Sequence, residues 1–194
     1  MEPIVLASGS PRRREILKKM GIPFTVMPDN SPEEFEPELS FTEQIEKFAI
    51  KKVKNIIKAT SDVNVPWILG ADTMILYNNK LYGKPATREE AKEMISGFSG
   101  NTHTVITAIA LWSSKNHELT TSIRENQVTF DALSQDEIEA YLDIGEWQGA
   151  AGGYRIQGEA SKFIKEIKGS YTSIMGLSIR DIYVMLKEQG YLFN

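Results

Sequence analysis

One stretch near the N-terminus, residues 4–14, reads IVLASGSPRRR and decides the expected fold. Its first four residues are apolar and predict a short buried strand. The small residues Ser8, Gly9 and Ser10 then form a turn. Ser10 is a good helix N-cap and Pro11 suits the first helical position, so a helix should follow. A strand that passes through a tight turn into a helix is typical of α/β folds.

Strand and helix signals alternate along the rest of the chain. Capping pairs Thr87/Glu90 and Ser134/Glu137 mark two helix starts. Helices are predicted over residues 11–20, 45–57, 88–98, 135–144 and 179–189. Strands are predicted over residues 4–7, 23–27, 67–69, 74–77, 105–112, 127–130 and 163–167. Because hairpins occur beside strand–helix–strand units, we expect an α/β fold with a mixed, twisted sheet and flanking helices.

Composition excludes several kinds of site. The 194 residues are 41% hydrophobic and 25% charged, include no cysteine and only two histidines, and carry a net charge of −4. Disulfides, thiolate zinc sites and a three-histidine metal centre are therefore excluded, and any metal should be held by oxygen, as Mg²⁺ or Mn²⁺ are. The sequence shows no signal-peptide pattern and no apolar run near the roughly 20 residues that cross a bilayer. We expect one cytoplasmic domain over residues 1–194, with neither membrane nor nucleic acid as a partner.

The turn after the first predicted strand is the first candidate site. Ser8, Ser10 and the arginines from Arg12 to Arg14 gather there. A helix N-terminus favours an anion, and guanidinium groups fit phosphate oxygens. The alternative is a solvated basic first turn, although cations at this helix end oppose the helix dipole. We favour a phosphate site, which lacks the G-x-x-x-x-G-K spacing of P-loops.

Two charged residues stand among apolar neighbours. Lys52 falls on the apolar stripe of its helix, where the ammonium either snorkels to solvent or reaches a bound polyanion. If it has no partner, Lys52→Met should leave stability unchanged or raise it. Asp72 follows the apolar residues 67–69. At a strand end it would be a metal ligand or general base, and otherwise it would cap a turn.

The remaining candidates give weaker signals. The glycine-rich segment 149–158 could let the backbone approach a ligand, and Gln157 offers a donor and an acceptor to a nucleobase edge. Without further context this segment is more often a plain loop. Lys84 reads as a surface lysine, Glu33 and Glu34 as a solvated acidic loop, and His103 as a structural residue.

Six segments, in this order, resemble the Maf family of nucleoside triphosphate pyrophosphatases. They read LASGSPRR (6–13), GADT (70–73), GKP (83–85), SGNTH (99–103), YRIQG (154–158) and GSY through MGL (169–177). The resemblance covers nearly the whole chain. It implies a fold similar to the inosine triphosphate pyrophosphatases, in which a mixed sheet forms two lobes around a central cleft.

The resemblance also implies roles for individual residues. Asp72 would accept a proton, and a divalent metal cation, Mg²⁺ or Mn²⁺, would be held by Asp72 and a loop glutamate. We assign that glutamate to Glu34, with Glu33 as the alternative. The residues expected around the triphosphate are Ser8, Ser10, Arg12, Arg13, Lys52 and Lys84. Arg13 (or Arg12), Thr73 and Gln157 match the combination typical of the subfamily that acts on dTTP and UTP.

Two positions depart from the family pattern. Ala150 stands where many members have a lysine, so a loop contact could be weaker or the base specificity shifted. Ser178 stands where a proline is usual, and it should cap the last helix.

The sequence therefore predicts an enzyme that hydrolyses dTTP or UTP, or modified pyrimidine nucleotides, to the monophosphate and pyrophosphate. One alternative is a nucleotide-binding regulator without catalysis, because family members are linked to septum formation and division arrest. Only the enzyme needs Asp72. A nucleic-acid-binding module that uses Arg12 to Arg14 conflicts with the net charge of −4. A homodimer stays open as a partner.

Overall fold

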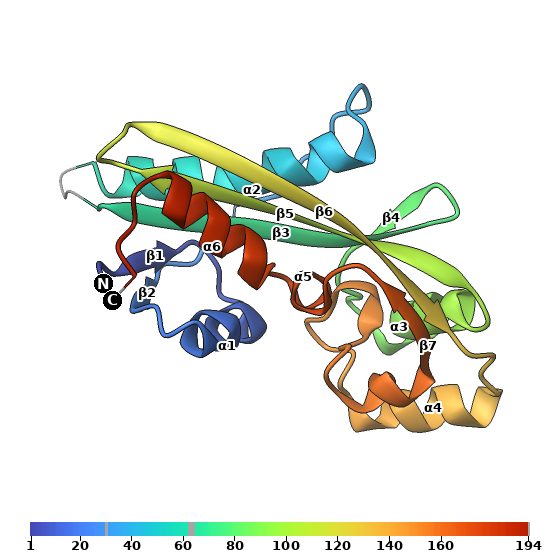
Figure 1. The fold of residues 1–194 in the computed structure, drawn as a ribbon. Coiled ribbons are helices and arrows are strands. Elements are labelled where there is room, and N and C mark those ends of the chain that lie inside the picture. Colours follow the sequence, from blue (N-terminus) through green and yellow to red (C-terminus); the bar gives the residue numbers. More distant parts are fainter. Residues whose placement is uncertain (30, 62–64, 194) are drawn as a thin grey trace. The chain divides into compact units, whose positions relative to one another are not determined.

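The computed structural model describes residues 1–29, 31–61 and 65–193. Its strands join one sheet in the order β2-β1-β3-β5-β6-β7, with β4 paired to β3 (Figure 1). The strands are β1 (Ile4–Leu6), β2 (Phe24–Val26), β3 (Trp67–Tyr77), β4 (Lys80–Tyr82), β5 (Thr102–Ser113), β6 (Glu118–Phe130) and β7 (Ile164–Lys168). β1 runs parallel to β2 and β3, whereas the β3–β4 and β6–β7 pairs are antiparallel. The predicted α/β fold with a mixed sheet is confirmed.

The helices are α1 (Pro11–Lys19), α2 (Phe41–Ala59), α3 (Arg88–Phe98), α4 (Gln135–Ile144), α5 (Tyr171–Met175) and α6 (Ile179–Glu188), with short 3₁₀ helices at η1 (Ala151–Gly153) and η2 (Glu159–Phe163). Four α-helices begin where the sequence predicts, whereas α2 begins at Phe41, four residues before the predicted start, and α5 was not predicted. The side chains of Thr87, Ser134 and Ser178 each accept a hydrogen bond from the backbone N–H three residues later. Gly145 ends α4 with a φ of 75°, a conformation that glycine adopts at low cost.

Strand β3 differs from the prediction of two strands with a break at residues 70–73. It runs unbroken from Trp67 to Tyr77. A Cβ placed on Gly70 would lie 2.7 Å from Val53 Cγ2 and 2.8 Å from the Ala49 carbonyl oxygen. Glycine is therefore required here because helix α2 packs closely against the strand, and it does not mark a turn.

Strand β6 is also longer than predicted, because it starts at Glu118 and not near Gln127. Its first eight residues are exposed or half-buried. Since the prediction relied on apolar residues, this outer half gave little signal. The Asn78–Asn79 hairpin turn is confirmed, with φ of 47° and 59° at the two residues.

The chain divides into two compact units. The first comprises residues 1–72, 107–123 and 176–194, and the second comprises residues 73–106 and 124–175. Strands β3, β5 and β6 contribute residues to both units. In the described part of the chain, no helix combines the length and the apolar character needed to span a membrane.

Candidate active site

The first unit places the carboxyl end of β1 beside a longer strand. β1 and β3 pair from Ile4–Trp67 to Leu6–Leu69. The Ala7 N–H then donates to the Leu69 carbonyl oxygen at 2.8 Å. Strand β3 continues past this point, and Asp72 follows three residues after Leu69. In open α/β sheets, ligands bind beyond the carboxyl ends of the strands. The Ser8–Ser10 turn lies beyond the end of β1, and Asp72 lies on the part of β3 that continues past that end.

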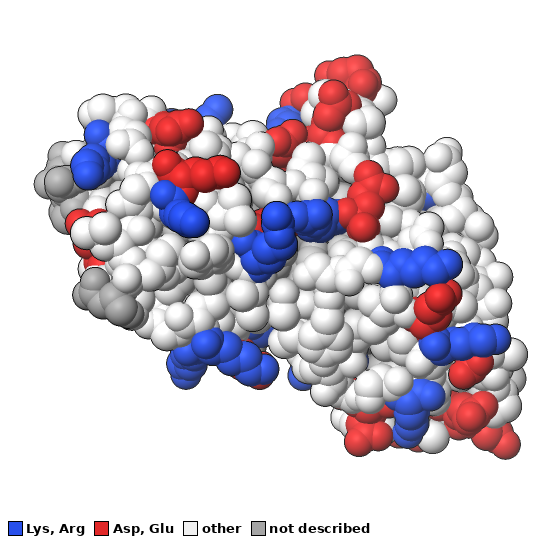
Figure 2. All heavy atoms as spheres, in the orientation of Figure 1, with Lys and Arg blue, Asp and Glu red and all other residues white. Residues whose placement is uncertain are grey.

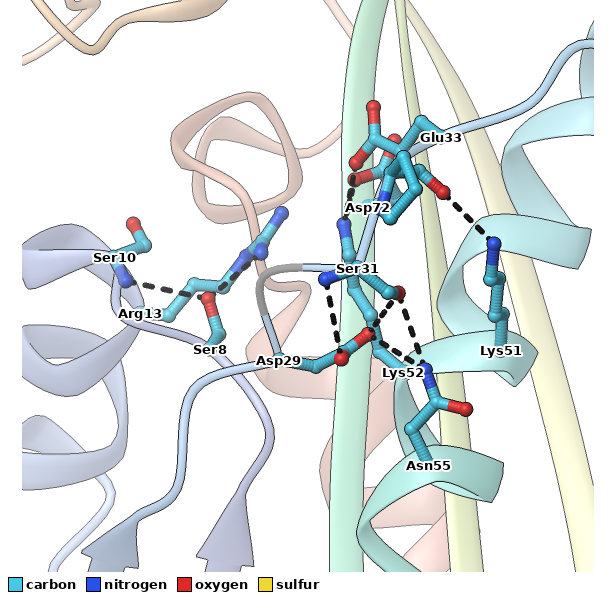
Figure 3. Close-up of polar contacts among 11 residues, drawn as sticks. Ser8, Ser10, Arg13, Asp29, Ser31, Glu33, Lys51, Lys52, Asn55 and Asp72 are labelled. Atoms are coloured by element: carbon cyan, nitrogen blue, oxygen red, sulfur yellow. Dashed lines mark hydrogen bonds and ion pairs between the residues drawn. The ribbon is translucent and has the colours of Figure 1, made fainter.

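The arginines of α1 do not form a solvated first turn. Arg13 is buried, and its Nη1 donates to Ser8 Oγ at 2.9 Å (Figure 3). The Ser10 N–H also donates to Ser8 Oγ, at 3.3 Å. Arg14 Nη2 donates to the Gly9 carbonyl oxygen at 3.0 Å, and Arg12 is half-buried. The turn and the arginines therefore hold one another in place, with cationic groups at the N-terminus of α1.

Arg13 is fixed from a second side by a residue to which the sequence assigned no role. Its Nε donates to the Gly176 carbonyl oxygen at 3.1 Å. Gly176 has a φ of 119°, a backbone conformation that favours glycine. Burial lowers the pKa of Arg13, and the negative charges of Asp72 and Glu33 oppose that effect. Because an arginine stays protonated in proteins, Arg13 is a permanent cation at this site.

Lys52 has two carboxylate partners, so the unpaired ammonium on which the expected stability of Lys52→Met rested is not present. Its Nζ contacts Asp72 Oδ1 and donates to Glu33 Oε1 at 2.9 Å (Figure 3). The Lys52 side chain is 13% exposed and that of Asp72 is 9% exposed. The close packing of α2 at Gly70 brings this lysine against the strand that carries Asp72.

Asp72 has one oxygen in the ion pair and one without a partner. Within the described residues, Oδ2 is buried and makes no hydrogen bond. Burial raises the pKa of Asp72, Lys52 and Arg13 lower it, and the like charge of Glu33 raises it, with a net upward shift. A carboxylate that is held by one oxygen and has a basic second oxygen is suited to accept a proton.

The structure brings Glu33, and not Glu34, to this cluster. The Glu33 carboxylate accepts a hydrogen bond from Lys52 Nζ at 2.9 Å, whereas at Glu34 the backbone carbonyl oxygen accepts from Gln44 Nε2 at 3.3 Å. The contact with Lys52 favours the alternative, Glu33, over Glu34 as the glutamate beside Asp72, and the metal-ligating role itself stays a prediction. The sequence could not choose between them, because neighbouring residues of an irregular loop point in different directions.

The carboxylates of Asp72 and Glu33 could supply some, but not all, of the ligands of a divalent cation. The described residues contain no group of three or more histidine, cysteine, aspartate or glutamate side chains placed to hold a metal ion. The unpartnered Asp72 Oδ2 and the Glu33 carboxylate offer oxygen donors. Mg²⁺ is commonly bound by one or two carboxylates together with substrate phosphates, and this donor set suits that arrangement.

Three predicted site residues, Thr73, Lys84 and Gln157, belong to the second unit. There the Gly152 N–H donates to the Gly83 carbonyl oxygen at 2.8 Å, which ties the glycine-rich segment to the loop of Lys84. Gln157 Oε1 is buried and has no hydrogen-bond partner in the described part of the chain. An unpartnered amide oxygen is suited to accept from a ligand N–H.

The segment that carries Gln157 is held from both ends. Before it, the Tyr154 hydroxyl lies 2.8 Å from His103 Nε2 in a buried aromatic cluster. After it, the Glu159 N–H donates to Glu146 Oε2 at 2.9 Å. A Cβ on Gly158 would lie 2.0 Å from the same Oε2 atom, so glycine lets the carboxylate reach the backbone. The segment is therefore an anchored structure and not a plain loop.

Of the predicted residues, the first unit contains Ser8, Ser10, Arg12, Arg13, Lys52 and Asp72, together with Glu33. Sequence reasoning missed four others that lie next to them: Asp29, Ser31, Lys51 and Asn55 (Figure 3). Polar residues spaced by three and four along α2, beside its apolar stripe, were the signal that could have revealed Lys51 and Asn55.

Comparison with known proteins agrees with the motifs. A family model described as Maf-like protein matches residues 3–189. The chain is 38% identical over 191 residues to the dTTP/UTP pyrophosphatase of Halalkalibacterium halodurans, covering 98% of both chains. It is equally similar to the dTTP/UTP pyrophosphatase of Pelotomaculum thermopropionicum, at 38% identity with 98% of both chains covered. A third relative, the dTTP/UTP pyrophosphatase of Bacillus anthracis, is 37% identical over 188 residues. The match covers 97% of this chain and 96% of that relative.

The motifs, the mixed sheet and the match over residues 3–189 therefore agree, and this chain belongs to the Maf family.

Proposed function

We propose that this protein hydrolyses dTTP and UTP between the α- and β-phosphates and releases the nucleoside monophosphate and pyrophosphate. The names of its relatives support the activity, because the matches cover 97–98% of this chain at 37–38% identity. One observation carries the proposal. The buried Asp72 carboxylate is held by Lys52 through one oxygen and has a second oxygen without a partner in the described residues.

In the proposed reaction, Asp72 Oδ2 accepts a proton from the water that attacks the α-phosphate. Lys52 fixes the other oxygen and keeps the carboxylate in one orientation. Arg13, Ser8 and the backbone N–H groups at the start of α1 bind phosphate oxygens, which positions the substrate and stabilises the leaving pyrophosphate. Ser10, Arg12 and Lys84 complete the set of groups that we assign to the triphosphate.

A divalent cation is part of the proposal. Mg²⁺ or Mn²⁺ would be held by Asp72 and Glu33 together with phosphate oxygens. When bound, it supplies positive charge that offsets the charge developing on the phosphates. Lys52 Nζ contacts both of these carboxylates.

The proposed base recognition depends on Gln157. The edge of uracil or thymine offers N3–H as a donor between two acceptors. The buried Gln157 Oε1 would accept from N3–H and the amide N–H would donate to a carbonyl oxygen, while we assign Thr73 to the same specificity. We propose a cytoplasmic location, because the nucleotides to be removed are in the cytoplasm.

The experiment is a panel of nucleoside triphosphates with pyrophosphate detection, on the wild type and on Asp72→Asn. We expect wild-type turnover of dTTP and UTP. Asp72→Asn should lower kcat by about 10²–10⁴-fold, because the general base is lost. Binding of a non-hydrolysable dTTP analogue should change little. Near-normal turnover in this variant would remove Asp72 from the mechanism, and a wild type that binds dTTP without hydrolysing it would favour the regulator.

A further inference from the structure

Helix α2 has a polar stripe next to its apolar one. Gln44, Lys47, Lys51 and Asn55 follow one another at intervals of three and four residues, so they share one face of the helix. The Gln44 Nε2 donates to the Glu34 carbonyl oxygen at 3.3 Å, and its Oε1 accepts from the Glu36 N–H at 2.7 Å. Lys51 Nζ donates to the Pro32 carbonyl oxygen at 2.8 Å, and Lys47 forms an ion pair with Glu36. The stripe therefore binds the described part of the loop before α2, residues 28, 29 and 31–39, at several points.

Asn55 binds the start of this loop through a cluster of three polar side chains, its own and those of Asp29 and Ser31, called the Asn55 corner below. Its Nδ2 donates to Asp29 Oδ2 at 3.2 Å and to Ser31 Oγ at 3.1 Å (Figure 3). Asp29 in turn accepts from the Ser31 hydroxyl at 2.7 Å and from the Ser31 N–H at 3.3 Å. These hydrogen bonds restrain Ser31, which lies two residues before Glu33.

The loop needs such restraints because it is strongly acidic. Figure 2 shows acidic side chains gathered over the loop and the start of α2. Glutamates occupy positions 33, 34, 36 and 38, and like charges at this spacing repel one another. Phe35, which is 55% exposed, makes an edge-on ring contact with Phe48, while the contacts described above are polar. The position of the Glu33 carboxylate therefore depends mainly on polar contacts.

We propose that Asn55 is a positioning residue for the reaction, which through Asp29 and Ser31 holds the Glu33 carboxylate against the Lys52–Asp72 pair. This inference rests on the proposed function, in which Glu33 contributes to cation binding. Gln44 holds the loop after Glu33, and Lys51 holds the Pro32 carbonyl oxygen directly before it. Asn55 holds Asp29 and Ser31, four and two residues before Glu33. Neither Asn55 nor Asp29 touches the reacting groups in this arrangement.

The test compares Asn55→Ala with Lys54→Ala, a control at the exposed neighbouring position of the same helix. We expect Asn55→Ala to raise the Mn²⁺ concentration for half-maximal dTTP hydrolysis about tenfold, as loss of a group that orients a metal ligand does. The kcat at saturating Mn²⁺ should change far less. Lys54→Ala should match the wild type in both. Equal half-saturating Mn²⁺ in wild type and Asn55→Ala would overturn the proposal.

Two further measurements separate positioning from general destabilisation. In a Glu33→Gln background, Asn55→Ala should add no further change in Mn²⁺ dependence, and an undiminished effect would overturn the proposal. If Asn55→Ala fails to fold, a double variant replaces it in the test. This variant carries Asp29→Asn together with Asn55→Asp. This exchange keeps one donor and one carboxylate in the corner and should restore near wild-type Mn²⁺ dependence, unlike Asn55→Asp alone. Failure of the exchange in a folded protein would overturn the proposal.

Binding of Mn²⁺ in the presence of the α,β-methylene analogue of UTP, followed by electron paramagnetic resonance, gives a readout without turnover. Asn55→Ala should weaken Mn²⁺ binding by the same factor of about ten. A wild type that hydrolyses neither dTTP nor UTP would contradict the proposed function, while this titration would still decide the role of Asn55.

Discussion

At the scale of single residues, Lys52 determines the charge balance of the site. Its ammonium is nearly buried and contacts Asp72 and Glu33. Removing one partner of a buried ion pair leaves the other charge uncompensated, at a cost of up to about 3–5 kcal/mol. Asp72 can avoid part of this cost by taking up a proton, because burial already raises its pKa.

We therefore expect Lys52→Met to lower the free energy of unfolding at pH 8 by about 1–4 kcal/mol, and by less at pH 5. The sign follows from the raised pKa of Asp72. The folded state binds this proton more tightly than the unfolded state, so stability falls as pH rises from the unfolded pKa towards the folded one. Urea unfolding at pH 5 and pH 8 measures the effect, with Lys54→Met as the exposed control. Unchanged or higher stability at pH 8 would contradict it.

Gln157 is the residue on which the base preference depends. In Gln157→Glu, an ionised carboxylate loses the amide donor and faces a carbonyl oxygen of the base. An unsatisfied buried polar group costs about 1–3 kcal/mol, or one to two powers of ten in relative specificity. We expect kcat/KM to fall more for dTTP and UTP than for CTP and GTP. The exposed Gln148→Glu is the control, and an equal fall for all four substrates would show that Gln157 does not read the base.

At the scale of elements, the packing of α2 on β3 decides whether the site can form. Gly70 gives the helix room, because a Cβ there would lie 2.7 Å from Val53 Cγ2 and 2.8 Å from the Ala49 carbonyl oxygen. A backbone atom cannot move aside as the end of a flexible side chain does. Any shift of α2 away from β3 also moves Lys52 away from Asp72.

Gly70→Ala should therefore lower the free energy of unfolding by about 1–3 kcal/mol, the usual cost of overpacking a core. The kcat/KM for dTTP should fall as well. Gly97→Ala is the matched control, because its Cβ would meet only Tyr77 Cε1 at 3.7 Å, and glycine costs about 0.5–1 kcal/mol within a helix. Urea unfolding and a dTTP assay check both variants. A stable, fully active Gly70→Ala would show that the helix has more freedom than the structure indicates.

At the scale of the whole molecule, His103 makes stability depend on pH. It is 2% exposed among Phe98, Phe130 and Tyr154, and burial lowers its pKa to about 3. The unfolded chain takes up this proton near the ordinary histidine pKa of about 6.5. Between these two values the unfolded state binds more protons, so stability is lost as pH falls.

We expect His103 to add up to about 1.4 kcal/mol per pH unit to the loss of stability below pH 6.5. The free energy of unfolding, measured in urea from pH 7 to pH 4.5, should fall less steeply in His103→Gln than in the wild type. His117→Gln, which changes the other histidine, should keep the wild-type slope. Equal slopes in all three proteins would mean that the pKa of His103 is the same in the folded and unfolded states, and would contradict the prediction.

Local signals in the sequence determined most elements of this protein. Serine and threonine caps, Gly145 and the Asn78–Asn79 turn act within a few residues, so they specify helix ends and a hairpin without tertiary contacts. The motifs around Ser8, Arg13 and Asp72 predicted a phosphate site with a carboxylate. Their order along the chain was enough to indicate the family.

Tertiary structure alone decided what those groups contact. Whether Lys52 has a partner, and whether Glu33 or Glu34 faces it, depends on contacts across 19 or 20 residues of the chain. The same is true of Gly70, which resembled a break in the strand until helix α2 was seen to pack against it. Hydrophobic periodicity and capping report on neighbours a few residues apart. The charge balance of the site depends on groups that only packing brings together, and for that reason it could not be predicted from the sequence.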